Sequence, residues 1–279
     1  MKIIINADDF GISHEVNTRI INCIRHNTIS STTIMANAPA FQEAIEYALQ
    51  DPSVSYGVHL NLIQFHPLTD ETIFRKYGIV DDCGDFIEGA IFALDNISDE
   101  LKQAIFQEWD AQISKVKESG IIPSHIDSHQ HTHAIYALMD VVTKLMKKHG
   151  ITKVRRSLVP SIRLMLNVKQ EETVHLDKSK AVVKKRQNII LRRLNLIKVI
   201  FRTSKWNRCM GKQFLLTNSF YAYRTFYWHS DVLVRRVAGQ TIELMVHPGL
   251  PAFESESKVL ESNGLQNNVP FHLITYNDL

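Results

Sequence analysis

The sequence predicts an α/β fold in which parallel strands are joined by crossover helices, as in a barrel or a doubly wound sheet. Short branched apolar runs without a helical period alternate with amphipathic stretches along the chain. The length of 279 residues, with 44% hydrophobic residues, suits one large core and lies in the range of single-domain α/β barrels. We therefore expect one domain over residues 1–279.

The first elements form a strand, turn and helix unit. Residues 3–7 are a branched apolar run that predicts a buried strand, and the chain is expected to turn at residues 8–11. Ser13 can cap the following helix. The inward face of that helix is predicted to hold Val16, Ile20, Ile21, Cys23 and Ile24.

The same alternation continues toward the C-terminus. Residues 63–96 are polar, lack a sustained period and predict a long excursion near a site. Gly120 and Gly150 are placed to end helices. The remaining strands are predicted at 32–36, at 54–62, after Pro123, from 154 and at 243–246, and the remaining helices at 41–49, 98–119 and 136–149.

Composition excludes several classes of protein. Cys23, Cys83 and Cys209 form no close-spaced pair, which disfavours both a disulfide framework and structural zinc. The apolar run at the start is too short for a secretion signal, and no run reaches the roughly 18 apolar residues that a transmembrane helix needs. We expect a soluble, cytoplasmic protein.

Polar clusters follow three of the predicted strands. They are Asp8-Asp9, His59 and the histidine-rich segment at residues 125–133. The carboxyl ends of parallel strands converge on one face, so these groups can meet there. Taken singly, the aspartates could belong to a turn, and His59 could be a hydrogen-bonded core residue.

The histidine-rich segment favours a metal or catalytic site. Period-2 alternation places His125, Asp127 and His129 on one side of an extended backbone, and burying that row without a partner would be costly. One carboxylate and two imidazoles give three ligands for a divalent ion and leave positions open for water and substrate.

These motifs resemble the YdjC-like carbohydrate deacetylase family, in the family's order. The matching segments are 6–11 (NADDFG), 31–33 (STT), 57–60 (GVHL), 125–133 (HIDSHQHTH) and 246–248 (VHP). The resemblance is close over about the first 155 residues. Beyond them it rests on Arg155 and the His-Pro-Gly ending, and residues 163–212 match nothing in the family.

The resemblance implies a distorted TIM-like (β/α) barrel that hydrolyses an N-acetyl group on an amino sugar or oligosaccharide, with a divalent metal, commonly magnesium. Two imidazoles and a carboxylate suit zinc, cobalt or manganese at least as well. Asp8 and Asp9 could exchange roles. Carried over by motif, the ligands are Asp9, His59 and His129, the general base is Asp8, the general acid is His247, and Arg155 orients or charge-balances Asp8.

Several of these residues also have a purely structural interpretation. His247 could be a structural histidine before a proline turn, and Arg155 beside Arg156 could be a solvated pair. His125, Asp127, His131 and His133 are expected to orient the ligand imidazoles, with His131 and His133 also candidates to face substrate. The candidates for stacking on sugar rings are Phe10, Tyr56, Phe65, Trp109, Tyr221, Tyr223, Tyr227 and Trp228.

A basic stretch dominates the second half. About 20 Lys or Arg and about 3 acidic residues lie between Lys144 and Lys212, and we interpret residues 163–212 as a basic helical insertion. The simpler interpretation is that these charges lie on solvated helix faces. The apolar stripe Ile190, Leu194, Ile197 and Phe201 beside basic residues also suits peripheral contact with an anionic membrane, or packing on the barrel.

Two other functions compete with deacetylation. One is a metal-dependent phosphoesterase that uses the same ligands. The other is a polyanion-binding protein with a vestigial metal site, although no aromatic-basic signature of a nucleic-acid module is present and we expect no nucleic-acid partner. A homodimer is left open, because the sequence does not determine the oligomeric state.

Overall fold

The computed structural model describes residues 1–157 and 189–279, with side chains from residue 197 onward in the second range. Its centre is a seven-stranded, wholly parallel sheet in the order β4-β3-β2-β1-β6-β5, with β7 paired to β1. The strands are β1 (Lys2–Phe10), β2 (Ser31–Ile34), β3 (Ser55–Leu60), β4 (Ile126–Ser128), β5 (Ser219–Ala222), β6 (Thr241–Val246) and β7 (His272–Leu273).

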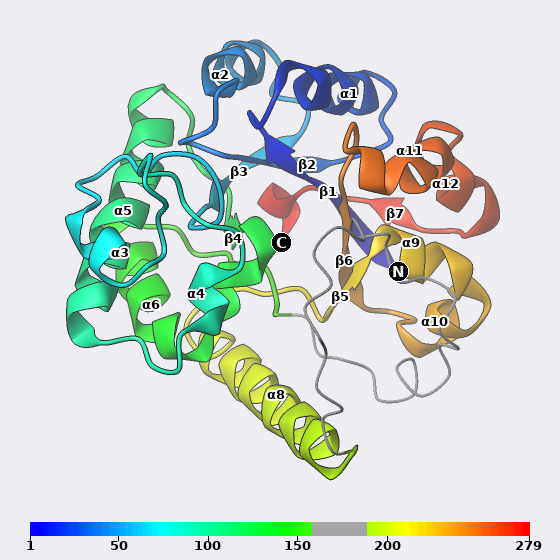
Figure 1. Cartoon of the computed structure of the whole chain (residues 1–279). Coiled ribbons are helices and arrows are strands. Elements are labelled where there is room, and N and C mark those ends of the chain that lie inside the picture. The colour runs from blue at the N-terminus through cyan, green and yellow to red at the C-terminus, as the bar shows by residue number, and fades with distance from the viewer. Residues whose placement is uncertain (158–188) are drawn as a thin grey trace.

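The sheet curls into a half-barrel, so the predicted distorted barrel is confirmed (Figure 1). Single-residue bridges extend the pairing beyond β4: Ile126 pairs with Val154, and Lys153 pairs with Leu215, which precedes β5. Lys153 and Val154 thus form single-residue bridges rather than the full strand predicted from residue 154.

Helices surround the sheet, with α1 and α2 at the top of Figure 1, α3 to α6 on the left and α9 to α12 on the right. The α-helices are α1 (His14–Arg25), α2 (Phe41–Gln50), α3 (Thr72–Lys76), α4 (Ala90–Ala93), α5 (Asp99–Glu118), α6 (Met139–His149), α8 (Ile189–Met210), α9 (Tyr223–Trp228), α10 (Ser230–Arg236), α11 (Glu254–Glu261) and α12 (Gly264–Asn268). The 3₁₀ turns are η1 (His129–Ala134), η2 (Tyr136–Leu138), η3 (Pro251–Phe253) and η4 (Tyr276–Asp278).

Local sequence signals fix several helix ends, and those at Ser13 and Gly150 are as predicted. The Ser13 hydroxyl accepts a hydrogen bond from the backbone N–H of Val16, and Ser98 caps α5 in the same way through Leu101. Gly150 ends α6 in the left-handed region at φ 70°, where a side chain would add strain.

One prediction in the first half is wrong. The turn expected at residues 8–11 begins later, because β1 continues through Phe10 and carries both aspartates within the strand. Residues 63–96, where the sequence predicts a long excursion, contain the short helices α3 and α4.

The strand alternation separates an apolar face from a polar one. Ile3, Ile5 and Ala7 of β1 belong to the hydrophobic core formed with the surrounding helices. The intervening residues belong to the opposite, inner face of the curl, as the period of two requires. Fully or almost fully buried polar residues therefore gather there: Asn6, Asp8, Thr33, His59, Asp127 and Glu243.

Helix α8 is the most separate element, and it projects from the lower edge of the molecule in Figure 1. It supports a helical character for the end of the basic stretch, whereas residues 163–188 lie outside the described part. None of the helices in the described ranges is long and apolar enough to cross a bilayer.

Candidate active site

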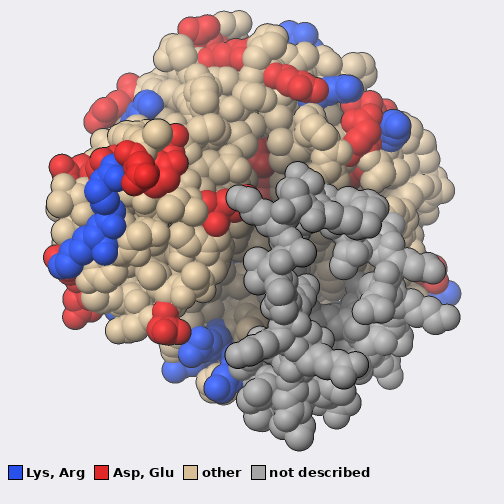
Figure 2. Space-filling view, in the orientation of Figure 1, with Lys and Arg blue, Asp and Glu red and all other residues tan. Residues whose placement is uncertain are grey.

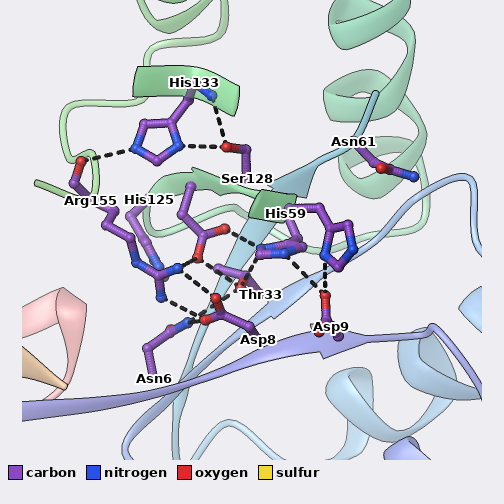
Figure 3. A network of polar contacts seen from close by, with 12 residues as sticks. Asn6, Asp8, Asp9, Thr33, His59, Asn61, His125, Ser128, His133 and Arg155 are labelled. Carbon is purple, nitrogen blue, oxygen red and sulfur yellow. Dashed lines mark hydrogen bonds and ion pairs between the residues drawn. The ribbon is translucent and has the colours of Figure 1, made fainter. Parts of the chain in front are cut away.

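The inner face of the sheet brings together the carboxylate and two imidazoles that the family resemblance implies as ligands. One ligand atom from each of Asp9, His59 and His129 lies within 4.8 Å of the others. Oδ1 of Asp9 is 3.2 Å from Nε2 of His59 and 2.8 Å from Nδ1 of His129 (Figure 3). The three residues come from β1, β3 and the first position of η1, so strand ends far apart in sequence converge as expected.

The backbone at Asp9 is specialised for this position. Its φ of 70° lies in the left-handed region, which aspartate tolerates better than most residues. The pairing of β1 with β2 shifts register between Ala7 and Phe10, as in a β-bulge. Two consecutive aspartates of one strand can therefore both contribute to the same site.

His59 is held by a carboxylate behind it. Its Nδ1 lies 2.7 Å from Oδ1 of Asp127 and 3.1 Å from the Thr33 hydroxyl, which also donates to Asp127. Burial alone would lower the pKa of His59, but Asp127 and the two neighbouring aspartates outweigh burial and raise that pKa to about 10. With Nδ1 bonded to Asp127, Nε2 is the nitrogen that faces Asp9.

Asp8 is bound by a buried arginine rather than by a histidine. Arg155 donates from Nη1 to Oδ2 of Asp8 at 2.7 Å and from Nη2 to Oδ1 at 2.6 Å. Asn6 adds a hydrogen bond to Oδ1 at 2.9 Å. Burial would raise the pKa of Asp8, but Arg155 more than offsets burial, so the carboxyl remains ionised.

The free atoms of the site distinguish the two aspartates. Oδ2 of Asp9 is buried and has no hydrogen-bond partner among the described residues, whereas both oxygens of Asp8 are engaged by Arg155. A buried carboxylate oxygen without a partner is costly unless it binds something. The residues present thus fit a divalent cation held by Asp9, His59 and His129.

A second group of possible ligand atoms, from Asp8, His59 and Asp127, meets the same distance criterion. Its atoms already have partners, however. Arg155 contacts both carboxylates, and Nδ1 of His59 is bonded to Asp127. This group is therefore a charge-compensated support rather than an open cation site.

His247 lies beside Asp8 at the end of β6. Its Nε2 is 3.9 Å from Oδ2 of Asp8, and its ring stacks on Phe253 at 4.1 Å. Burial lowers the pKa of His247, but Glu256, Asp8 and Asp9 outweigh burial and raise it overall. The Glu256 carboxylate also accepts the backbone N–H of His247 at 2.8 Å, which fixes this loop.

The site reaches the surface through two histidines. The side chains of His129 and His247 are 12% and 13% exposed, whereas those of His59 and Asp9 are 1% exposed. On the face drawn in Figure 2, a few acidic atoms are recessed near the middle among mostly uncharged atoms. A substrate would thus meet these two imidazoles first.

The other histidines of the segment occupy separate environments. His125 is buried and stacks on Tyr276 at 3.5 Å, and His133 contacts the Ser128 hydroxyl at 2.6 Å and packs against Trp206. Burial holds the pKa of each well below its usual range. His131 is half-buried at an edge-on contact with Phe220. Strand alternation does not extend to His129, because β4 ends at Ser128.

Sequence reasoning missed the acidic residues that complete the network. The sequence pattern places Glu243 only at the start of a strand, and it gives Glu256 no role. Glu243 is fully buried and accepts from Nε of Arg155 at 2.7 Å. A lone glutamate inside the apolar run TIELMV is the signal that could have marked it. Arg155 is fully buried and is not half of a solvated pair with Arg156.

Half of the eight aromatic residues proposed for sugar stacking belong to the buried core. Phe10, Trp109 and Tyr223 are fully buried, and Tyr56 is nearly so. Trp228 is 48% exposed.

Comparison with known proteins gives consistent matches. The family model described as "YdjC-like protein" matches residues 2–270. A carbohydrate deacetylase from Vibrio parahaemolyticus serotype O3:K6 is 36% identical over 158 residues, which cover 54% of this chain and 57% of that protein. One from Clostridium beijerinckii is 32% identical over 151 residues, 54% of this chain and 58% of that protein. The chain thus matches somewhat more than half the length of these curated relatives.

A solved structure matches the whole fold. It is a putative cellobiose-phosphate cleavage protein from Enterococcus faecalis V583, with a TM-score of 0.70 and 22% identity. The match covers 99% of this chain and 98% of that one. The likeness establishes the arrangement of strands and helices.

Proposed function

Because the chain belongs to the YdjC-like protein family, we propose that it is a metal-dependent hydrolase that removes N-acetyl groups from an amino sugar or oligosaccharide. The observation that carries the proposal is the pairing of an arginine-bound carboxylate, Asp8, with an adjacent open ligand set. The two curated relatives described above, both named carbohydrate deacetylase, support it.

The proposed ligands are Asp9, His59 and His129. A divalent ion held there would polarise the acetyl carbonyl and acidify a water molecule. Magnesium is the ion that the family resemblance implies, whereas two imidazoles and one carboxylate also suit zinc, cobalt or manganese. Asp127 and Thr33 support this set by fixing the orientation of His59.

The proton transfers are assigned to Asp8 and His247. Asp8 accepts the proton of the attacking water at Oδ2, the oxygen that faces His247, and its lowered pKa keeps it ionised beforehand. His247 donates from Nε2 to the departing sugar nitrogen, and its raised pKa favours the protonated form. Arg155 keeps the Asp8 carboxylate in place while its charge changes.

The test is acetate release from a panel of N-acetylated mono- and oligosaccharides, before and after chelation, with ions restored singly. We expect release that one or more ions restore. Asp8→Asn should abolish it, whereas Asp99→Asn, at a carboxylate that is fully exposed, should not. Equal or faster turnover of phosphoesters would replace this proposal with a phosphoesterase, and release that survives chelation would overturn the metal dependence.

We further propose a single domain in which α8 makes peripheral contact with anionic membranes. Ile197 and Phe201 of α8 are 60% and 67% exposed, Lys198 and Arg202 are exposed beside them, and the α8 sequence contains no Asp or Glu. Flotation with phosphatidylglycerol-containing vesicles should recover the protein, and neutral vesicles should not. Phe201→Ser should weaken recovery more than Ile122→Ser, at an exposed apolar residue elsewhere.

The compartment and the assembly state complete the proposal. Cys23, Cys83 and Cys209 are all free thiols, as suits a reducing cytoplasm. The assembly state is either a monomer or a homodimer, and light scattering of the purified chain distinguishes the two.

A further inference from the structure

A chain of buried polar contacts continues beyond Arg155, away from the substrate side of the site. Nε of Arg155 donates to Oε1 of Glu243 at 2.7 Å. Oε2 of the same carboxylate accepts from the Tyr276 hydroxyl at 2.5 Å. All three side chains are completely buried. The contacts thus run from the C-terminal turn through the sheet to Asp8.

Tyr276 is itself fixed from several directions. Its ring stacks on His125 at 3.5 Å and 8°. Its backbone N–H donates to the Ser55 hydroxyl at 3.0 Å, and its carbonyl accepts from Lys153. The turn that carries it, η4, begins with a capping box between Thr275 and Asp278. A tyrosine held at its ring and its backbone is a rigid anchor for the group that its hydroxyl contacts.

The geometry of a guanidinium explains why such an anchor matters. Its five N–H donors lie in one plane, so contacts on its Nε edge fix the direction of the Nη fork. In this chain the fork carries Asp8 and the Nε edge carries Glu243. Nη1 also approaches Oδ2 of Asp127 at 2.7 Å, so an unanchored arginine has a competing acceptor.

We propose that Glu243 and Tyr276 are positioning residues, which act through Arg155 to orient the Asp8 carboxylate toward the reacting water. Neither residue belongs to the proposed ligand set, and both are completely buried. Tyr276 also lies beyond residues 2–270, the part of the chain that the family model matches. The inference rests on the proposed deacetylation for its kinetic readout.

Burial supports this role for Glu243. Burial raises the pKa of the Glu243 carboxyl to about 7, although Arg155 and the Tyr276 hydroxyl act in the opposite direction. The buried Glu243 carboxylate is held in place by its hydrogen bonds to Arg155 and Tyr276, because a buried acceptor that loses a partner pays a desolvation cost. Removing either partner should therefore release the other end of the contact chain.

The principal test is Tyr276→Phe, which removes one hydroxyl and keeps the stacked ring. We expect kcat to fall between about tenfold and a hundredfold, as for a reacting group misplaced by up to about 1 Å, with KM and metal affinity unchanged. The matched control is Tyr56→Phe, which removes a buried hydroxyl bonded to the Asp51 carbonyl at 2.8 Å, away from Arg155. It should leave kcat within twofold of the unmodified protein.

A second variant separates position from charge. Glu243→Gln keeps an acceptor for Arg155 and a donor for Tyr276, so it should retain more activity than Glu243→Ala. In the double variant Tyr276→Phe with Glu243→Ala, kcat should fall no further than in Glu243→Ala alone, because both changes break the same chain. Additive losses would overturn the inference, and so would Tyr276→Phe with unchanged kcat or with a rise in KM alone.

A readout that needs no substrate separates this inference from the proposed function. The Nε–H proton of Arg155 should exchange slowly with water by NMR, and faster in Tyr276→Phe but not in Tyr56→Phe. If Tyr276→Phe speeds exchange of the Arg155 Nε–H proton but the unmodified protein releases no acetate, the proposed reaction is refuted. The inference that Tyr276 anchors Arg155 then stands. Unchanged exchange would overturn the inference whether or not acetate is released.

Discussion

Replacing Arg155 with methionine tests the charge balance on which the whole site depends. The guanidinium is the partner of three carboxylates, Asp8, Asp127 and Glu243, each at 2.6–2.7 Å and each at most 2% exposed. Methionine fills similar space without charge. Removing one partner of a buried ion pair typically costs about 3–5 kcal/mol, because the other charge stays buried without compensation.

The same magnitude follows from protonation. If one carboxyl with an ordinary pKa near 4 must take up a proton at pH 7, the cost is about three pKa units at about 1.4 kcal/mol each, or about 4 kcal/mol. The folded variant then has a raised carboxyl pKa, so its stability falls as pH rises above about 4. The deficit relative to the unmodified protein should therefore be smaller at pH 5 than at pH 7.5.

Urea unfolding at these two pH values measures the effect as a change in midpoint at constant slope. The control is Arg156→Met, because Arg156 is only partly buried and donates to one carbonyl, that of Thr217, at 3.1 Å. It should cost about 1 kcal/mol. If Arg155→Met fails to fold, adding Asp8→Asn and Glu243→Gln should restore folding. A loss below about 1 kcal/mol at pH 7.5 would refute the idea that Arg155 offsets these buried charges.

Three further predictions concern pH, metal and local structure. Burial lowers the pKa values of His125 and His133 below the value near 6.5 that they have in the unfolded chain, so the unfolded chain binds more protons. The free energy of unfolding should therefore fall as pH drops below 6.5, by up to about 1.4 kcal/mol per pH unit for each histidine. A denaturation midpoint that stays constant between pH 6.5 and 5 would contradict this. His129→Ala should lower the affinity for the activating ion at least about tenfold in calorimetric titration while circular dichroism stays native, because one of three ligands is lost; equal affinity would exclude His129 as a ligand. Ser98→Ala should lower the stability by about 1 kcal/mol in thermal unfolding without changing activity, because α5 loses its cap to Leu101; an unchanged midpoint would show that water replaces the hydroxyl.

The sequence was informative where the period of a strand and the chemistry of its end coincide. The polar residues that follow apolar runs mark Asp8-Asp9, His59 and residues 125–133, and the family resemblance narrows these to Asp9, His59 and His129. The structure brings the ligand atoms of these three residues within 4.8 Å. Ser13 is predictable as a cap because capping is local. Each of these predictions needs information from only a few neighbouring residues.

The missed residues depend on contacts that no local pattern encodes. A period of two says that Glu243 and Leu244 point to opposite faces, but not which face is the inside of a curled sheet. Arg155 and Arg156 look alike in sequence, yet only Arg155 meets the buried carboxylates. Tyr276 contacts Glu243, which lies 33 positions earlier in the sequence, and His125, which lies earlier still.

Adjacent aspartates with different partners show how the backbone divides one motif into two tasks. In a regular strand Asp8 and Asp9 would point to opposite faces, and only Asp8 would reach the inner one. The left-handed φ of 70° at Asp9, together with the register shift against β2, brings its carboxylate to His59 and His129 instead. Arg155 occupies both oxygens of Asp8, so Asp9 keeps the free oxygen. The proposed roles of Asp8 as base and Asp9 as ligand therefore follow from the left-handed backbone of Asp9 and the buried guanidinium of Arg155.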